Sequence, residues 1–356
     1  MPIDPGDPRW DALVAEHPNA SVYHLSAWAR ILRDAYGYEP RYLALEDADG
    51  GMRGGLPMME MRGALGGRRL RSMPVIPAGR ALTRSNDDTA RLLAGACELA
   101  EERSAKALTI LGRDAGLEAI EPRLVEVPKT PTWILRLPDD PGQLRARWRK
   151  RSINLHRSIE RALNADLRVR EGAAEDDLRA FYSLYLMTMR RHNVLPRSLR
   201  QLALARDLLP TGVFRLVIVE LGGTPIAGGV FHDFNGTVDL LYSASDSRHL
   251  GVRPNHALYW HVIERAIEHG RLAFDFGRAR PHTPLARFKS QWGAEPVAEH
   301  RYELRGERAR ARADRRRDAI ERLAVAHERR RLVKRAWDRT PLALTRLAGE
   351  IAYRWL

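Results

Sequence analysis

The sequence has almost no cysteine and no long apolar run. Its single cysteine, Cys97, excludes an intramolecular disulfide framework and is typical of a reducing compartment. The amino terminus has neither a basic start nor an apolar core, so it does not resemble a signal peptide. No stretch approaches the roughly 18 consecutive apolar residues that predict a membrane-spanning helix. We therefore expect a cytoplasmic protein.

Basic charge, in contrast, is in excess and unevenly spread. The 356 residues are 44% hydrophobic and 29% charged, enough for two domains with buried cores, and the net charge is +14. Residues 301–356 carry 17 Lys and Arg against 8 Asp and Glu. Residues 145–170 carry 9 Lys and Arg against Glu160 and Asp166. Both segments indicate anionic partners, such as phosphates, nucleic acid or a lipid surface.

Two parts of the chain share one order of predicted elements: a helix, strands joined by turns, a second helix and a last strand. In the first part we expect helices at 26–37 and 88–103 and strands at 42–47, 52–61 and 106–113. In the second part we expect helices at 177–191 and 256–269 and strands at 214–221, 226–234, 237–245 and 272–278. The pattern predicts a duplicated mixed α/β (α+β) domain, the alternative being a coincidence between two ordinary α/β segments.

A block of motifs in the second part resembles the FemAB-like transferases. These are tandem-GNAT proteins related to the aminoacyl-tRNA-dependent enzymes that build peptidoglycan cross-bridges. The motifs are, in order, Pro254-Asn255, Tyr259-Trp260, Phe274 to Arg278, Phe288-Lys289 and Trp292 to Pro296. Residues 54–74 are similar to the amino-terminal domain of this family, and residues 335–356 resemble the end of a branch associated with exosortase and exopolysaccharide systems.

The resemblance implies two GNAT-like domains that face a cleft. We place them at residues 1–140 and 141–305, followed by a basic helical tail at 306–356. The chemistry implied is direct transfer of an acyl group from a thioester or an aminoacyl ester to an amine. It needs no metal, no permanently bound cofactor and no covalent enzyme intermediate.

Two residues are candidates for catalysis. Direct aminolysis needs a positive group where the carbonyl oxygen becomes negative, and the resemblance assigns this role to Lys289. The alternative is a surface lysine on a short helix. Asp275 could hold the incoming amine or fix Arg278, and the alternative is a structural carboxylate paired with a nearby arginine.

The donor site is expected between Arg248 and Asn255. This segment stands where the GNAT enzymes place a glycine-rich turn that binds the pyrophosphate of coenzyme A. Arg248 and Gly251 fit that pattern, whereas Arg253 replaces its last small residue and counts against coenzyme A. Arg248 and Arg253 could instead bind another phosphate or the 3′ end of an aminoacyl-tRNA, or form an exposed basic turn. Asn255 is assigned to the same site, although capping the helix that follows is the simpler role.

The acceptor site is expected on a basic helix at residues 145–163, with Trp148, Ile153, Leu155 and Ile159 along its apolar side. Candidates to bind an anionic acceptor, such as a nucleotide- or lipid-linked saccharide, are Arg149, Lys150, Arg151, Arg157, Tyr259 and Arg278. The alternative is a solvated basic helix. No metal is expected, because His256 and His261 lie five residues apart and do not share a helix face.

The end of the chain is amphipathic. Leu344, Leu347, Ile351 and Trp355 fall on one helix face beside Arg346 and Arg354. Such a stripe suits contact with an anionic membrane and suits packing on the protein body equally well.

Together these features predict an acyltransferase. We expect it to move an acyl or aminoacyl group from acyl-coenzyme A or aminoacyl-tRNA to an amine of a cell-envelope or polysaccharide precursor. One alternative is a coenzyme A-dependent N-acetyltransferase acting on an amino sugar. Another is a catalytically silent scaffold that binds membrane or RNA. The expected location is the cytoplasm, at the inner face of the membrane if the tail binds lipid.

Overall fold

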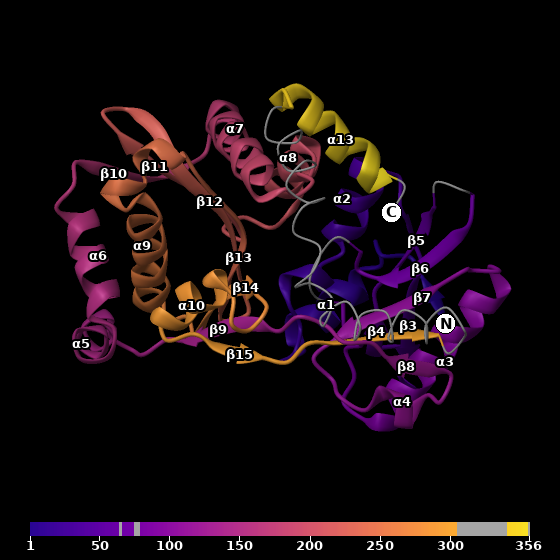
Figure 1. Cartoon of the computed structure of the whole chain (residues 1–356). Coiled ribbons are helices and arrows are strands. Elements are labelled where there is room, and N and C mark those ends of the chain that lie inside the picture. Colours follow the sequence, from indigo (N-terminus) through magenta and orange to yellow (C-terminus); the bar gives the residue numbers. More distant parts are fainter. Residues whose placement is uncertain (64–65, 75–78, 305–339, 355–356) are drawn as a thin grey trace. The chain divides into compact units, whose positions relative to one another are not determined.

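The computed structural model describes residues 1–63, 66–74, 79–304 and 340–354, and the chain divides into two units (Figure 1). The first unit comprises Met1–Lys129, Ala298–Arg339 and Ala348–Leu356, and the second comprises Thr130–Val297 and Thr340–Leu347. Of the tail expected at 306–356, residues 306–339 and 355–356 lie outside the described part, and with them Trp355 of the expected apolar stripe. Helix α13 (Leu342–Arg354) is described. Among the described helices, none is both long and apolar enough to cross a membrane.

The described residues of the first unit form two sheets. A three-stranded sheet has the order β1 (Pro2–Ile3), β3 (Tyr42–Glu46), β4 (Met52–Leu56). A six-stranded sheet has the order β2 (Glu39–Pro40), β5 (Met58–Arg62), β6 (Arg68–Ser72), β7 (Leu108–Gly112), β16 (His300–Leu304), β8 (Leu124–Glu126). The helices are α1 (Pro8–Glu16), α2 (Ala27–Tyr36), α3 (Asn86–Glu102) and α4 (Leu117–Ile120), with a short 3-10 helix η1 (Val22–His24).

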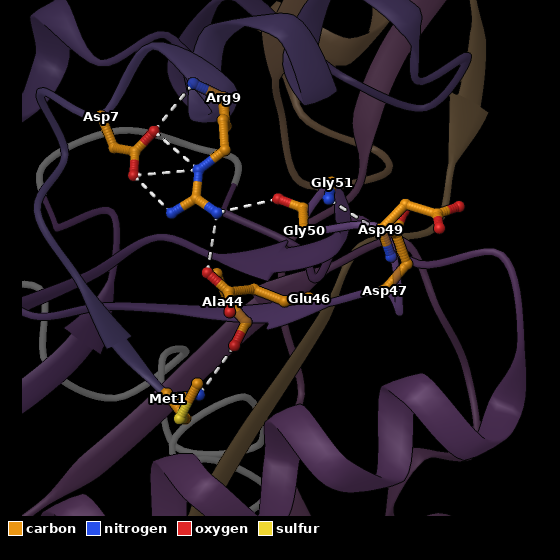
Figure 2. Close-up of polar contacts among 9 residues, drawn as sticks. All are labelled: Met1, Asp7, Arg9, Ala44, Glu46, Asp47, Asp49, Gly50 and Gly51. Atoms are coloured by element: carbon orange, nitrogen blue, oxygen red, sulfur yellow. Dashed lines mark hydrogen bonds and ion pairs between the residues drawn. The ribbon is translucent and has the colours of Figure 1, made fainter.

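The start of the chain is fixed to the β3–β4 hairpin by polar contacts (Figure 2). The guanidinium of Arg9 is ion-paired with Asp7 at 2.7 Å and with Glu46 at 2.8 Å, and it donates to the carbonyl oxygen of Gly50 at 2.9 Å. The terminal ammonium of Met1 donates to the carbonyl oxygen of Ala44 at 2.7 Å. These contacts hold β1 against β3.

Residues 52–61 are not the single strand that the sequence pattern predicts. Pro57 separates β4 from β5, and the two strands pair with β3 and β2 in different sheets. Proline has no N–H to donate to a sheet, so a strand ends or bends there. Strand β6 has no counterpart among the predicted strands, because arginines at 68, 69 and 71 obscure its alternation.

Helix α3 crosses between two parallel strands, β6 and β7. The Ser85 hydroxyl caps it by accepting a hydrogen bond from the backbone N–H of Asp88 at 3.1 Å. Leu92, Leu93 and Ala96 on its inner face are fully buried in the core of the first unit. The crossover places the amino terminus of α3 beside the carboxyl ends of both strands.

The second unit is built on one seven-stranded sheet. Its order is β10 (Leu167–Gly172), β11 (Phe214–Leu221), β12 (Thr224–Phe234), β13 (Thr237–Ser245), β14 (Ala273–Arg278), β9 (Thr132–Arg136), β15 (Glu295–Val297). The helices are α5 (Pro141–Arg151), α6 (Ile153–Leu163), α7 (Glu175–His192), α8 (Leu199–Leu208), α9 (Pro254–Glu268) and α10 (Pro284–Gln291). A 3-10 helix, η2 (Ser247–Val252), precedes α9.

Helices cover both faces of this sheet (Figure 1). Alternate residues of β11 point to opposite faces, as the pleat requires. Val217 and Val219 join the core beneath α5, α6 and α9, whereas Leu216 and Ile218 join the core beneath α7 and α8. Alternate residues of 214–221 therefore belong to two separate hydrophobic cores, one on each face of the sheet.

The two units repeat one topology and exchange one strand. In each, a helix crosses between two parallel strands, α3 between β6 and β7 and α9 between β13 and β14. Strand β9 follows the first unit in sequence but lies between β14 and β15, while β16 follows the second unit and lies between β7 and β8. The mixed α/β class and the duplicated order are confirmed. The boundary between the units differs from the expected 140/141. Strand β9 belongs to the seven-stranded sheet of the second unit, and residues 298–304 return to the first unit.

The basic helix expected at 145–163 is broken in two. Ser152, with φ −145° and ψ 60°, ends α5, and α6 begins at Ile153. The break changes the helical register, so Ile153 is 45% exposed rather than part of the apolar side. Trp148, Leu155 and Ile159 are buried as expected.

Candidate functional site

The candidate residues of the second unit gather where β13 and β14 diverge. The two parallel strands pair from Thr237 to Asp239 with Ala273 to Asp275. Beyond those pairs β13 continues to Ser245 and β14 to Arg278, and within the described sheet no further pair joins them. Helix α9 crosses between them, so its first turn lies at the carboxyl ends of both strands. Ligand sites of α/β sheets lie at this end of parallel strands.

Lys289 is buried beside the end of β14. Its side chain is on α10, which starts at Pro284 with Thr283 as its cap, and the residue is only 4% exposed. The Nζ atom donates to the carbonyl oxygens of Gly277 and Arg278, at 2.8 and 3.1 Å. An ammonium has three donors, and no contact within the described chain accounts for the third. The alternative of a surface lysine is therefore wrong.

The surroundings of Lys289 change its acidity. Burial lowers the pKa of the ammonium to about 8, with the Arg278 charge adding to the decrease and the Asp275 carboxylate opposing it. The ring of Trp292 lies on the same segment and packs against Phe276 and Phe288, with ring centroids 5.9 and 6.2 Å apart. Lys289 is thus mostly charged at neutral pH and sits beside a largely apolar cluster.

Asp275 organises the end of β14. Its Oδ1 accepts a hydrogen bond from the backbone N–H of Gly277 at 2.7 Å and from the hydroxyl of Thr132, on β9, at 2.5 Å. Gly277 has φ +74°, a conformation that a side chain would disfavour. Asp275 therefore holds a turn of the backbone whose carbonyl oxygen binds Lys289. Arg278 itself is exposed, and neither a hydrogen bond nor an ion pair of its side chain is found in the described part.

Tyr259 and Asn255 face the end of β13. The Tyr259 hydroxyl and the Ser243 hydroxyl are 2.8 Å apart, and burial raises the pKa of Tyr259 to about 12, so it stays neutral. The Asn255 Nδ2 donates to the Ser245 hydroxyl at 3.3 Å. Its Oδ1 is buried, and no hydrogen-bond donor for it exists among the described residues. Asn255 is not the expected helix cap, because Pro254 begins α9 and Arg253 occupies the cap position.

The turn before α9 departs from a glycine-rich phosphate loop. The guanidinium of Arg248 is engaged by the carboxylate of Asp246, at 2.6 Å. Gly251 has no positive φ, and a Cβ added to it would meet open space, so nothing in the backbone requires glycine there. Arg253, in contrast, has φ +60° and ψ 44°, the left-handed region that favours glycine. The sequence departs from the pattern at the one position where the backbone conformation calls for glycine.

His256 is a residue of this site that the sequence argument did not assign. It lies in the first turn of α9, stacks on Trp292 with ring centroids 6.0 Å apart, and meets Phe288 edge-on at 5.7 Å. Burial, together with the smaller effect of the nearby Arg253 charge, lowers the pKa of His256 to about 4, so the imidazole is neutral at physiological pH. Its position at the helix start was the available signal. No group of His, Cys, Asp and Glu that could hold a metal ion occurs in the described part.

The basic candidates on α5 and α6 lie in solvent. Arg149, Lys150, Arg151 and Arg157 are all exposed. Trp148 attaches this segment to the site by donating from Nε1 to the carbonyl oxygen of Trp292 at 3.0 Å, three residues after Lys289. The structure therefore joins the segment to the residue that ends α10. The four cations face solvent, and Arg149 also donates from Nε to His156 Nε2 at 3.4 Å.

Comparisons with known proteins agree with this architecture. Residues 149–290 match the family model of the acetyltransferase (GNAT) domain. Among solved structures, FemX aligns with a TM-score of 0.65 and 17% identity, covering 85% of this chain and 96% of its own. The C-terminal domain of a protein named as a lysylphosphatidylglycerol synthetase, from Agrobacterium fabrum, aligns with a TM-score of 0.60 and 11% identity, covering 85% and 93%.

A tandem GNAT protein from the clavulanic acid biosynthesis pathway aligns with a TM-score of 0.52 and 14% identity, covering 86% of this chain and 97% of its own. No curated protein matches the sequence significantly. These likenesses to solved structures establish the fold, and the family model identifies the domain that carries Lys289.

Proposed function

Because the chain is an acyltransferase with a FemAB-like tandem GNAT fold, we propose that its second unit transfers an acyl or aminoacyl group directly to an amine, with Lys289 stabilising the transition state. The observation that carries this proposal is the buried Lys289 ammonium at the end of β14, with one donor left for a ligand. A buried, preorganised cation is worth most where negative charge develops during reaction.

The proposed step follows from this geometry. The lone pair of a neutral amine attacks the carbonyl carbon of the donor, and the carbonyl oxygen becomes negative beside Lys289. The bond from carbon to sulfur or ester oxygen then breaks, and the leaving group departs with its electron pair. The proton lost by the amine ends on the leaving group, which departs as a thiol or an alcohol. Asp275 acts as a positioning residue, because it holds the turn whose carbonyl oxygens orient Lys289.

For the donor, the first turn of α9 offers Arg253, Asn255 and the neutral His256. We assign the donor to this turn, with aminoacyl-tRNA favoured over acyl-coenzyme A because an arginine side chain stands at the left-handed position. The second candidate function is a coenzyme A-dependent N-acetyltransferase acting on an amino sugar. The match of residues 149–290 to an acetyltransferase domain favours it.

For the acceptor, Arg149, Lys150, Arg151 and Arg157 form an exposed basic strip on α5 and α6. Opposite charge raises the encounter rate with an anionic molecule. We assign this strip, with Tyr259 and Arg278, to an anionic precursor of the cell envelope or of a polysaccharide.

For location, α13 supports a peripheral contact with the inner face of the membrane. Leu344, Leu347 and Ile351 are 54%, 49% and 52% exposed, although they are large and apolar. They recur at helical spacing beside Arg354. Apolar burial and attraction to anionic lipid act together on such a face.

The test compares donors on the whole chain. Purified protein is incubated with an amino sugar or a nucleotide-linked envelope precursor, and either acetyl-coenzyme A or a mixture of aminoacyl-tRNAs, and the products are read by mass spectrometry. Formation of an amide that Lys289→Met abolishes and Lys106→Met does not supports the proposal; Lys106 is an exposed lysine of the first unit. Equal yields from the wild type and Lys289→Met would refute the assigned role of Lys289.

A further inference from the structure

The first unit contains a cavity of about 700 Å³ at the amino terminus of α3 and the carboxyl end of β7. Such a volume lies within the roughly 300–1,000 Å³ range of small-molecule sites. Its polar lining includes Arg80, Arg84, Ser85, Asn86, Arg113 and Asp114. None of these residues belongs to the acyl-transfer site of the second unit.

The charge of the lining selects for an anion. Three arginines face one carboxylate, and that carboxylate, Asp114, is already ion-paired with Arg80. The Nε atom of Arg80 is buried, and no acceptor for it occurs among the described residues. Arg84 is exposed, and in the part of the chain that the structure describes its side chain makes no ion pair. Arg80 and Arg84 thus bring guanidinium donors to the cavity that no described residue satisfies.

The start of α3 adds main-chain donors to this cavity. The first backbone N–H groups of any helix have no acceptor within it, and here the Ser85 hydroxyl occupies only the N–H of Asp88. The amides of Asn86 and Asp87 remain, at the positive end of a 17-residue helix. Two carboxylates of this first turn would oppose an anion, and neither lines the cavity: Asp88 is ion-paired with Arg53 at 3.1 Å, and Asp87 is exposed to solvent.

The internal duplication relates the position of this cavity to the donor turn of the second unit. The β6–α3–β7 crossover of the first unit corresponds to the β13–α9–β14 crossover of the second. The cavity therefore occupies, in the first unit, the place that the donor turn occupies in the second. We propose that it is a separate binding site for a small organic phosphate, whose phosphate groups are bound by Arg84, Arg113 and the first turn of α3.

The experiment measures binding to the full-length protein by isothermal titration calorimetry at low salt. Inorganic pyrophosphate is the first probe, and uridine diphosphate and adenosine 3′,5′-diphosphate separate a nucleotide-sugar source from a coenzyme A source. We expect saturable binding with one site per chain. Arg84→Ala should weaken it at least about tenfold, as loss of a charge-assisted hydrogen bond does. Thermal unfolding checks that the variant is folded.

Arg91→Ala is the matched control, because Arg91 is an exposed arginine of the same helix that does not line the cavity. Arg253→Ala controls for binding at the turn before α9. The proposal is supported if only the cavity variant loses affinity. It is overturned if none of the three probes binds at millimolar concentration, or if Arg84→Ala and Arg91→Ala weaken binding equally, which is the result that general attraction to a basic protein gives. Because this experiment measures binding and not turnover, a negative result would refute the cavity site without bearing on the proposed role of Lys289.

Discussion

Replacing Lys289 by methionine tests the transition-state role most directly. Methionine keeps an unbranched chain of similar length and removes the charge. Removal of one oxyanion donor lowers kcat about 100- to 1,000-fold in other acyl-transfer enzymes, and we expect an effect of this size with little change in KM. The pH dependence of the rate gives a second test of Lys289, because burial lowers its pKa from 10.5 to about 8. The buried ammonium is therefore disfavoured by about 3 kcal/mol, and at pH 7 about nine in ten molecules retain the charge.

The protonation state predicts the shape of the pH–rate profile. The acceptor must lose a proton to react, so kcat should rise with pH at first. It should then fall above about pH 8 as Lys289 loses its charge. Lys289→Met should lack this fall, since no ammonium is left to titrate. Turnover can be followed by release of the coenzyme A thiol or by loss of aminoacyl-tRNA.

The pKa itself can be measured without knowing the substrates. The chain has only five lysines, Lys106, Lys129, Lys150, Lys289 and Lys334, so selective isotope labelling gives a simple NMR spectrum. One signal should titrate near pH 8 and be absent from Lys289→Met. If the rate keeps rising through pH 9 while that signal titrates near 8, the neutral amine is the active form and the proposed role is wrong. A variant with wild-type kcat would refute it as well.

Three further outcomes follow from single features. Arg253→Gly relieves a residue at φ +60°, so the free energy of unfolding in urea should rise by up to about 1 kcal/mol while KM for the donor increases; an unchanged KM would separate Arg253 from the donor site. Burial lowers the pKa of His24 to about 4, below its ordinary 6.5. The unfolded chain then binds the proton more readily, so stability should fall as pH drops from about 6.5 towards 4, and His24→Asn should flatten that slope. Serine at Leu344, Leu347 and Ile351 should abolish flotation with vesicles of anionic lipid but not change turnover of a soluble acceptor; full flotation would place the membrane contact elsewhere.

The fold could be predicted because both copies carry local signals. The period-two strands at 214–245 and the amphipathic helix at 256–269 are set by which residues are apolar, and the structure forms them close to those bounds. Strand β6 and the break at Ser152 could not be found in this way. In both places a run of arginines masks the apolar pattern, and packing of distant segments decides the outcome.

The candidate site was predicted unevenly for a similar reason. Residues of successive motifs, such as Tyr259 and Phe288, lie together because α9, β14 and α10 follow one another along a short stretch of the chain. The burial of Lys289 could not be read from its spacing, which suits a surface helix equally well. The place of His256 in the site could not be predicted, because it depends on the packing of its ring against Trp292 and Phe288.

The exchanged strand explains why the expected domain boundary misses part of the site. Thr132 lies on β9, before residue 140, and its hydroxyl binds Asp275 in the second sheet. Asp275 in turn holds the N–H of Gly277, and the carbonyl oxygen of Gly277 receives a hydrogen bond from Lys289. A chain of three contacts therefore runs from a strand encoded in the first half of the sequence to the proposed catalytic ammonium. No local pattern could reveal it, because the partners are 143 residues apart. A second unit beginning at residue 141 would keep every motif but lose the strand that orients them.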